Sequence, residues 1–276
     1  MRFAGVVVLY NPEDNVFENI IGYVNELDVL FVVDNSEHKN EALIHKLRDL
    51  RQVRYLDNEG NKGIAFALNR AARGAIKLRM NWLLMMDQDS SISGDMLIKM
   101  KEYVIQNKDE RLGIVAANFL KAERDRKKLS IPVTYEDEVI TSGSMIDLRI
   151  YGICGGFLNS LFIDEVDHEY CLRIRKQGYK IIKLNNIMFR HNMGNAARAG
   201  AIVMYNYSPV RYYYISRNRH YVAKLYKKDF PEICNWKRQV LRRWFICILN
   251  EDKTLIKLLY IFRGYMDYQI GRMGKL

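Results

Sequence analysis

Short apolar segments alternate with amphipathic segments over the first 117 residues of this chain. The apolar segments carry few charges, as strands covered on both faces do, and they span residues 3–10, 29–34, 53–56, 82–86 and 112–117. The segments between them place apolar residues at helical spacing and span residues 16–25, 41–50, 64–75 and 96–105. Because strands that alternate with helices form right-handed βαβ units, we predict an α/β fold with a mostly parallel sheet flanked by helices.

The second half of the chain is less regular. We expect a charged excursion at 121–128, an alternating strand at 141–147, a helix ending near Gly178, and closing strands at 180–184 and 187–191. From about Asn206, aromatic and basic residues interleave in what we predict to be two or three amphipathic helices. We therefore expect a sheet domain, residues 1–205, and a helical C-terminal region, residues 206–276, that could contact either a membrane surface or another copy of the chain.

Positive charge is concentrated at the end of the sequence. The 276 residues carry a net charge of +11, and from Tyr205 onward fifteen lysines and arginines stand against five acidic residues. A basic region of this kind suits nucleic acid, an anionic membrane surface or phosphate-bearing substrates.

The four cysteines form no CxxC pair, and no histidine lies at zinc-site spacing from them, so we expect neither a zinc site nor a disulfide framework. No apolar run approaches the roughly 18 residues of a membrane span, and no signal peptide is visible. These features predict a cytoplasmic protein, with peripheral attachment to the inner face of the cell membrane as an alternative.

Polar residues follow the predicted strands at their carboxyl ends, where ligands bind in sheets of this type. Asp87 and Asp89 emerge directly from a buried strand. Two carboxylates separated by one residue can face a hard divalent cation, which would neutralise the phosphates of a nucleotide. The alternative is that Asp89 caps the helix that follows.

Four further places are candidates for chemistry, each with a structural alternative. Asp34 could accept the imide N–H of a pyrimidine base or cap a turn. The loop 58–63 opens a helix and could bind phosphate, although it matches neither GxGxxG nor a Walker motif. The acidic run 164–169 could supply a general base or complement a helix dipole. His191 could be a third metal ligand or a surface residue.

These segments, in this order, resemble the family 2 glycosyltransferases, which have the GT-A fold. The resemblance spans roughly residues 3 to 220, and its later motifs are most similar to the rhamnosyltransferase-like branch that builds bacterial surface polysaccharides. The residues that carry it are Val7-Val8-Leu9-Tyr10-Asn11, Val33-Asp34-Asn35-Ser36, Asn61-Lys62-Gly63-Ile64-Ala65, Asp87-Gln88-Asp89, Ser142-Gly143-Ser144, Gly155-Gly156-Phe157, the stretch 162–173, His191 and the stretch 208–218.

The resemblance implies a role for each position. Asp167 would be the catalytic base, with Glu169 as its acidic neighbour. The metal, Mg²⁺ or Mn²⁺, would be held by Asp89, Asp87 and His191. The nucleotide sugar would be bound by Tyr10, Asn11, Asp34, Asn61, Lys62, Gly63, Asp87 and Gln88, and the acceptor side would be bordered by Ser142, Gly143, Ser144 and Gly156. Val166 stands where many members carry a glutamate, so Asp164 and Glu165 remain rivals of Asp167.

The function implied is an inverting transfer of a rhamnose-like or other hexose from a UDP- or dTDP-sugar to a hydroxyl of a glycan acceptor, which could be linked to polyprenyl diphosphate. A nucleotidyltransferase is the first alternative, but the N-terminal Gly-rich loop typical of that class is missing. A nucleic-acid-binding module is the second, and we expect no nucleic-acid partner because acidic clusters at the sheet edge repel phosphate. The aromatics Tyr212, Tyr213, Tyr214, Trp236, Trp244 and Phe245 suit either a membrane interface or a packed helical subdomain.

Overall fold

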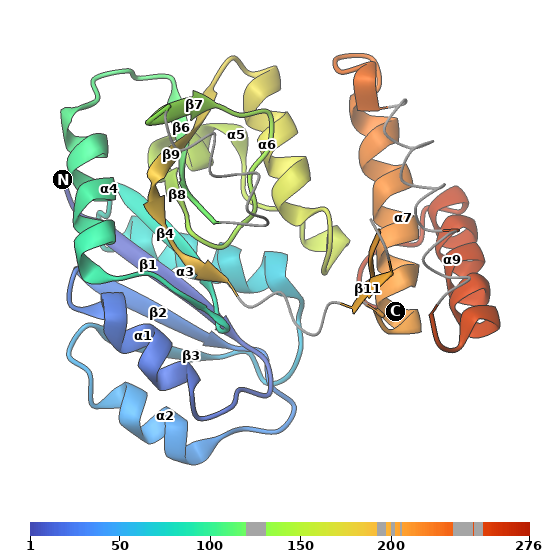
Figure 1. Cartoon of the computed structure of the whole chain (residues 1–276), viewed down its shortest axis with the longest axis horizontal. Helices are drawn as coiled ribbons and strands as arrows, with labels where there is room; N and C mark the ends of the chain where they lie inside the picture. The colour runs from blue at the N-terminus through green and yellow to red at the C-terminus, as the bar shows by residue number, and fades with distance from the viewer. Residues whose placement is uncertain (120–130, 192–196, 200–201, 205, 234–244, 246–250) are drawn as a thin grey trace.

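The computed structural model of the chain describes residues 1–119, 131–191, 197–199, 202–204, 206–233, 245 and 251–276. Within these residues an eight-stranded sheet has the order β3-β2-β1-β4-β8-β6-β9-β7 (Figure 1). Its strands are β1 (Phe3–Leu9), β2 (Val29–Asp34), β3 (Val53–Asp57), β4 (Trp82–Asp87), β6 (Leu112–Asn118), β7 (Val133–Tyr135), β8 (Ser144–Asp147) and β9 (Lys180–Met188). The predicted α/β fold with a mostly parallel sheet is confirmed.

Two strands of the sheet, β8 near its centre and β7 at its edge, run opposite to the other six. The strands β3, β2, β1 and β4 are parallel neighbours, and β6 is parallel to β9. Between these two groups β8 runs antiparallel to both β4 and β6, and β7 is an antiparallel edge strand beside β9. The carboxyl ends of β1, β2 and β4 therefore lie at one edge, which is where the ligand of such a sheet is expected.

Helices cover both faces of the sheet, because successive side chains of a strand point to opposite faces. On β1, Val6 packs in one apolar cluster and Val7 in the other. The first cluster includes α3 (Ile64–Lys77), α5 (Leu148–Cys154) and α6 (Val166–Lys176). The second includes α1 (Val16–Val24), α2 (Glu41–Arg48) and α4 (Gly94–Gln106).

One expectation about the strands was wrong. Residues 180–191 were expected to form two closing strands, but β9 runs unbroken from Lys180 to Met188. The polar pair at 185–186 does not make a turn, because the buried amide of Asn185 donates to the Ile131 carbonyl and to Thr134 Oγ1. The irregularity appears as a shift of register against β6. A separate short strand, β10 (Arg190–His191), pairs instead with β5 (Ser90–Ser91).

In the part of the C-terminal region that the structure describes, two long helices lie side by side, α7 (Pro209–Tyr226) and α9 (Thr254–Gln269). Ser208 caps α7 by accepting the Arg211 N–H, and Pro209 occupies the first turn. The cluster beneath α3, α5 and α6 also contains Val222 and Tyr226 of α7. A short hairpin, β11 (Ala197–Ala199) and β12 (Ile202–Met204), precedes α7.

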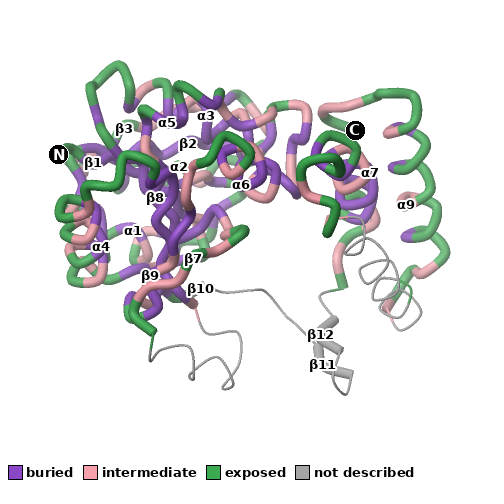
Figure 2. The backbone as a smooth tube through the Cα atoms, turned by 90° about the horizontal axis from the view of Figure 1, so that it is seen from above, coloured by how far each residue is buried: buried purple, intermediate pink, exposed green. Residues whose placement is uncertain are grey.

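Tyr212, Tyr213 and Tyr214 are buried, so these three aromatics pack inside rather than facing a membrane (Figure 2). Trp236 and Trp244, which were considered with them, and the excursion at 121–128 lie outside the described residues. No helix in the described part of the chain is long and apolar enough to cross a membrane.

Candidate active site

Asp87 ends β4, and the turn that follows it is fixed to the end of β1. The side-chain amide of Gln88 bonds the Tyr10 backbone in both directions, accepting its N–H at 2.9 Å and donating to its carbonyl at 3.2 Å. The Asp87 N–H donates to Ser142 Oγ at 3.1 Å. Gln88, expected to bind the nucleotide sugar, thus positions the two carboxylates on either side of it.

Negative charge accumulates around Asp87. Burial, together with the charges of Asp89 and Asp167, raises the pKa of Asp87 to about 7, and Arg211 opposes the shift. A cation bound beside these carboxylates would relieve the repulsion that raises the pKa of Asp87. The 87–89 segment and Asp167, eighty residues apart in sequence, therefore meet in one electrostatic site.

The donor set at this place consists of two carboxylates. Among the described residues, no group of three or more His, Cys, Asp or Glu is arranged to hold a metal ion. The backbone of His191 pairs with Ser90, which brings that residue beside Asp89. Two carboxylates with the charge excess at Asp87 fit Mg²⁺ or Mn²⁺, since such ions commonly take the remaining oxygens from water and substrate phosphates.

Asp34 is fully buried at the end of β2. Its carboxylate accepts the Ser36 N–H at 2.8 Å and the Tyr55 hydroxyl at 2.7 Å. Burial and this hydrogen bond raise the pKa of Tyr55. Asn11, which follows β1, donates its N–H to Ser36 Oγ, and this bond links the end of β1 to the end of β2. Each Asp34 oxygen keeps a second lone pair for a base N–H.

The loop before α3 is a hydrogen-bonded turn. Asn61 Oδ1 accepts the Gly63 N–H at 3.0 Å, and the Asn35 amide donates to the Gly63 carbonyl. Gly63 has φ +88°, and a Cβ there would lie 2.6 Å from the Phe162 carbonyl oxygen. Lys62 is exposed beside this turn, where its charge can meet an anion at the helix N-terminus.

The residues expected at the acceptor side lie deeper than expected for substrate contacts. Ser142 and Ser144 are buried, and Ser144 Oγ donates to the Ile140 carbonyl. Gly143 has φ +74° and lies against the Phe189 ring, where a Cβ would come within 2.6 Å. A Cβ on Gly156 would lie 2.4 Å from the Tyr151 hydroxyl. Ser142 is nevertheless connected to the site, because its Oγ accepts the hydrogen bond from the Asp87 N–H.

Asp167 lies in the first turn of α6 and is held by backbone groups. Its Oδ2 accepts the Thr141 N–H at 3.2 Å and its Oδ1 accepts the His168 N–H at 3.0 Å. The loop that delivers it is strained, because three of the four residues 162–165 have positive φ: Phe162 at 65°, Asp164 at 60° and Glu165 at 65°. Non-glycine residues adopt this conformation only where the surroundings enforce it, often next to functional sites.

The neighbouring carboxylates are paired with cations. Asp164 accepts from Arg211 at 3.2 Å, and Glu165 accepts from Arg219 at 2.8 Å. Although burial opposes it, bonds and charges from His168 and Arg219 lower the pKa of Glu165 to about 2. In the described part of the chain, Asp167 makes no ion pair with a lysine or arginine, which leaves its carboxylate available as a base.

Glu169 is held on both oxygens. Arg173 forms a salt bridge of 2.6 Å with its Oε2, and the Tyr226 hydroxyl donates to its Oε1 at 2.6 Å. The same guanidinium donates to the carbonyls of Cys154, Gly155 and Gly156. Glu169 therefore ties α6 to the glycine turn and to α7.

The loop at 159–165 is held from α7 by two residues for which no role was predicted. Asn218 is fully buried, and its amide donates to the carbonyls of Leu161, Ile163 and Asp164 at 2.8, 2.7 and 3.1 Å. Arg217, also fully buried, donates to the carbonyls of Ser160 and Leu161. In the sequence, the signal that could have identified them is an Arg-Asn pair that follows a largely apolar run of the same helix.

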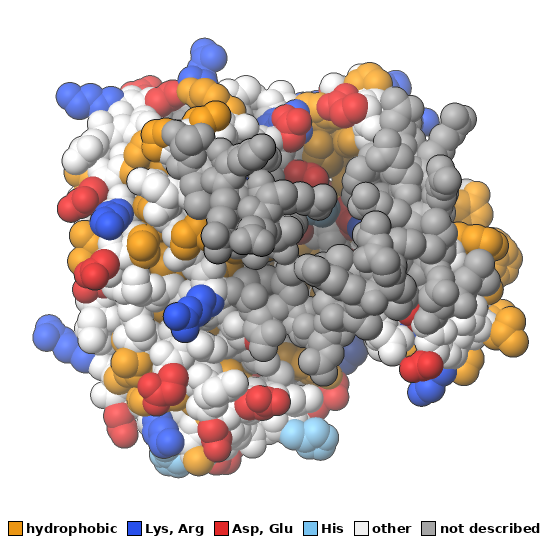
Figure 3. All heavy atoms as spheres, in the orientation of Figure 1, with side chains coloured by type: hydrophobic (Ala, Val, Ile, Leu, Met, Phe, Trp, Pro, Cys, Tyr) orange, Lys and Arg blue, Asp and Glu red, His pale blue; other side chains and the backbone are white. Residues whose placement is uncertain are grey.

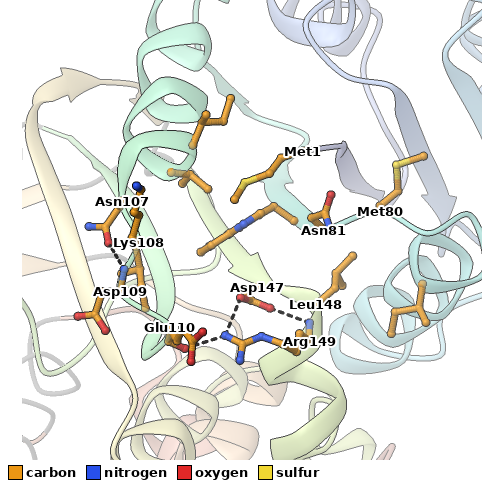
Figure 4. Close-up of a pocket in the computed structure, with 15 residues that line it drawn as sticks. Met1, Met80, Asn81, Asn107, Lys108, Asp109, Glu110, Asp147, Leu148 and Arg149 are labelled. Atoms are coloured by element: carbon orange, nitrogen blue, oxygen red, sulfur yellow. Dashed lines mark hydrogen bonds and ion pairs between the residues drawn. The ribbon is translucent and has the colours of Figure 1, made fainter.

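An open cavity of about 630 Å³ lies at the opposite edge of the sheet (Figure 4). It is bordered by Met1, by Trp82 at the start of β4 and by Asp147 at the end of β8. Asp147 and Glu110 both accept from Arg149 at its rim. The cavity is therefore separated from Asp87 by the length of β4.

Comparison with known proteins agrees with this geometry. The family model described as Glycosyl transferase family 2 matches residues 6–158. The chain is 29% identical over 235 residues to the dTDP-rhamnosyl transferase RfbF of Shigella flexneri, and the match covers 77% of each protein. This bears out the rhamnosyltransferase-like resemblance and favours a glycosyltransferase over the nucleotidyltransferase and nucleic-acid alternatives.

Solved structures show the same fold at low identity. The mannosyltransferase PcManGT from Pyrobaculum calidifontis, in complex with GDP-Man and Mn²⁺, superposes with a TM-score of 0.61 at 15% identity, covering 98% of this chain and 88% of that one. TarS 1–349 of S. aureus, in complex with UDP-GlcNAc, gives 0.55 at 14% identity, covering 98% and 73%. The GT-A type architecture is thus confirmed, and the chain belongs to glycosyl transferase family 2.

Proposed function

We propose that this chain is an inverting, metal-dependent glycosyltransferase that moves a rhamnose-like hexose from a dTDP-sugar to a hydroxyl of a glycan acceptor in the synthesis of a bacterial surface polysaccharide. The observation that carries the proposal is the meeting of Asp87, Asp89 and Asp167 in one electrostatic site at the carboxyl end of β4. The similarity to RfbF favours dTDP, and UDP is the second choice.

The donor would lie across the ends of β1, β2 and β4. Asp34, at the end of β2, would accept the N–H of a pyrimidine base, and Lys62, which is exposed, would face the diphosphate together with the α3 N-terminus. A divalent cation held by Asp89, with Asp87 and His191 as further ligands, would neutralise the charge that develops on the leaving diphosphate. The paired negative charge at Asp87 and Asp89 supports this assignment.

Asp167 would act as the base. The acceptor hydroxyl oxygen forms a bond to the anomeric carbon while the bond from that carbon to the diphosphate oxygen breaks. The hydroxyl proton passes to Asp167, and the electron pair leaves with the nucleoside diphosphate. Displacement in line inverts the anomeric carbon. The backbone N–H groups of Thr141 and His168 hold the Asp167 carboxylate in place for this step.

The acceptor we propose is a growing glycan on polyprenyl diphosphate, which would place the enzyme at the inner face of the cell membrane. Its sugar hydroxyl would approach Asp167 over the exposed side of the 87–89 turn, because Asp89 is exposed there. Ser144, which is buried, and Gly156, which is half-buried against the Tyr151 hydroxyl, would shape that side through packing rather than by touching the sugar.

The test is a turnover assay with purified protein, offered dTDP-rhamnose, UDP-GlcNAc and GDP-mannose with a glycan lipid extract. We expect transfer from dTDP-rhamnose, loss on EDTA treatment and recovery with Mn²⁺ or Mg²⁺. Asp167→Asn should lower kcat by a factor on the order of 10² to 10⁴. Asp95→Asn, a surface change on α4, is the matched control. Undiminished turnover in Asp167→Asn, or transfer that survives metal removal, would contradict the mechanism.

A further inference from the structure

The helix α9 has its polar and apolar sides reversed relative to an ordinary surface helix. Its charged residues Lys257 and Asp267 are buried against α7 at 2% and 5% exposure. Lys257 pairs with Glu251, and Asp267 accepts the Tyr213 hydroxyl at 2.7 Å. The charges on the inner side are therefore satisfied, and the helix is anchored to α7 by polar contacts.

The outer side of α9 is an apolar stripe. Its residues recur at spacings of four, three, four and four, which places them on one line of the helix. They are Leu255, Leu259, Phe262, Met266 and Ile270, with exposed fractions of 77%, 66%, 63%, 42% and 65%. At about 1.5 Å per residue the stripe is roughly 22 Å long. Figure 3 shows orange side chains gathered along the right edge of the molecule, over α9.

The charge around the stripe is positive. Arg263 is the one charged residue of α9 that is exposed, since Lys257 and Asp267 are buried. Lys253 precedes the helix beside the exposed Asp252, and Arg272 and Lys275 follow it, where they pair with Asp267 and Glu37; all three cations are exposed, so the balance around the stripe stays positive. An apolar line flanked by cations is complementary to the headgroup and acyl boundary of an anionic membrane.

A second copy of the chain fits this face less well. In an antiparallel two-fold pairing of α9 helices, the middle of the stripe lies at residues 262–263. Such a pairing would bring the two Arg263 guanidinium groups together at the centre of an apolar contact. Like charges at that place oppose association, whereas anionic phosphate groups would attract both the arginine and the cations at the helix ends.

We propose that the outer face of α9 is a membrane-docking surface, on which the helix lies parallel to an anionic phospholipid bilayer with Leu255, Leu259, Phe262, Met266 and Ile270 in the acyl boundary. This inference does not depend on the transferase reaction. It places docking on α9 instead of on the buried tyrosines of α7. Because α7 carries both α9 and the contacts to the 159–165 loop, the docked protein would hold its site at a fixed height above the lipid.

The experiment is co-sedimentation of the full chain with vesicles of phosphatidylcholine alone or with about 30% phosphatidylglycerol. The test variant is Leu259→Ser with Phe262→Ser. The matched control is Ile105→Ser with Ile153→Ser, two apolar residues of the sheet domain that are 51% and 59% exposed. Thermal unfolding, which needs no substrate, checks that each variant is folded.

We expect the parent and the control to bind anionic vesicles equally, and the α9 variant to partition at least tenfold less with an unchanged Tm. Arg263→Gln should weaken binding to anionic vesicles by a smaller factor and leave binding to neutral vesicles unchanged. Equal binding of the α9 variant, absence of binding by the parent, or a parent dimer that the α9 variant dissociates would overturn the proposal. Each of these results is independent of whether transfer is detected.

Discussion

The hydroxyl of Tyr226 donates a hydrogen bond of 2.6 Å to Oε1 of Glu169, joining the last turn of α7 to the first turn of α6. Glu169 is buried, and its other oxygen is held by Arg173. The helix that carries Asp167 is thus braced from the C-terminal region. The consequences of this brace and of the neighbouring contacts can be measured separately.

Tyr226→Phe should destabilise the fold by about 1–3 kcal/mol, because the buried Oε1 of Glu169 loses one of its two donors and keeps only Arg173 Nε. Tyr135→Phe, at a tyrosine that is 73% exposed, should change the free energy of unfolding by less than about 0.5 kcal/mol. Urea denaturation of both variants gives the comparison. Equal stabilities of Tyr226→Phe and the parent would show that the bond contributes nothing.

Asn218→Ala should lower kcat by roughly 10- to 100-fold while leaving nucleotide affinity nearly unchanged. The carbonyls of Ile163 and Asp164 lose their Asn218 donor and that of Leu161 keeps Arg217 as a side-chain donor, so Asp167 is delivered less accurately, whereas Asp34 and the 58–63 turn make no hydrogen bond with Asn218. Titration with dTDP and steady-state kinetics separate the two effects.

The control for that variant is Ser216→Ala, which removes a buried hydroxyl of α7 that bonds the Ile261 carbonyl of α9 instead of the loop. Its kcat should stay within about twofold of the parent. If Asn218→Ala weakened dTDP binding as strongly as it lowered kcat, the loop contacts would have a general structural role rather than a role in positioning the base.

His168 should make stability depend on pH. Although burial lowers it, the charges of Asp167, Glu165 and Glu138 raise the pKa of His168 from 6.5 to about 10. Its stabilisation is therefore complete below pH 6.5 and is lost as the pH rises towards 10. The Glu165 pKa of about 2 lies below its ordinary 4.5, so the stabilisation by that carboxylate is present above pH 4.5 and is lost as the pH falls towards 2.

The stability advantage of the parent over His168→Gln should consequently be largest between pH 4.5 and 6.5 and shrink by up to about 1.4 kcal/mol per pH unit above it. Thermal unfolding from pH 4 to 10 measures this difference. His45→Gln, at an exposed histidine of α2, should run parallel to the parent. A constant offset between parent and His168→Gln would mean that the pKa of the histidine is the same in the folded and unfolded states, which would contradict the raised pKa.

Gly63→Ala should be more damaging than Gly60→Ala. Both glycines have positive φ, 88° and 99°, so both substitutions add backbone strain of about 1–2 kcal/mol. At Gly63 the added Cβ would also meet the Phe162 backbone, whereas nothing lies within 4 Å of it at Gly60. The difference between the two free energies of unfolding reports this close approach together with the further strain at Gly63, whose ψ of 158° lies in a region essentially restricted to glycine, and equal values would exclude both.

The strands and helices of the first half could be predicted because apolar periodicity is a local property. The segments at 29–34 and 82–86 are nearly or completely apolar, and the structure buries them in β2 and β4. Their shared carboxyl edge follows from parallel pairing, so the proximity of Asp34 to the 87–89 turn was foreseeable. The insertion of β8 antiparallel between β4 and β6 was not, since strand order depends on contacts far apart in sequence.

The hydrogen-bond partners of the candidate residues could not be predicted either, because they too lie far away in sequence. Asp34 finds Tyr55 on β3, 21 residues away, and the Leu161 carbonyl finds Asn218 57 residues away. The acidic run at 164–169 offered equivalent carboxylates in sequence, and only the distribution of cations separates Asp167 from Glu165 and Glu169. The roles assigned to them stay predictions until the variants above are measured.

Phe162, Asp164 and Glu165, the three positive-φ residues of the 159–165 loop, restrict how this chain can be recombined with its relatives. Arg217 and Asn218 recognise the loop through main-chain carbonyls, so what they require is its backbone shape. A chimera that exchanges the chain after residue 206 would have to exchange residues 159–165 with it. A functional chimera should therefore take both segments from the same parent protein, although more than forty residues separate them along the chain.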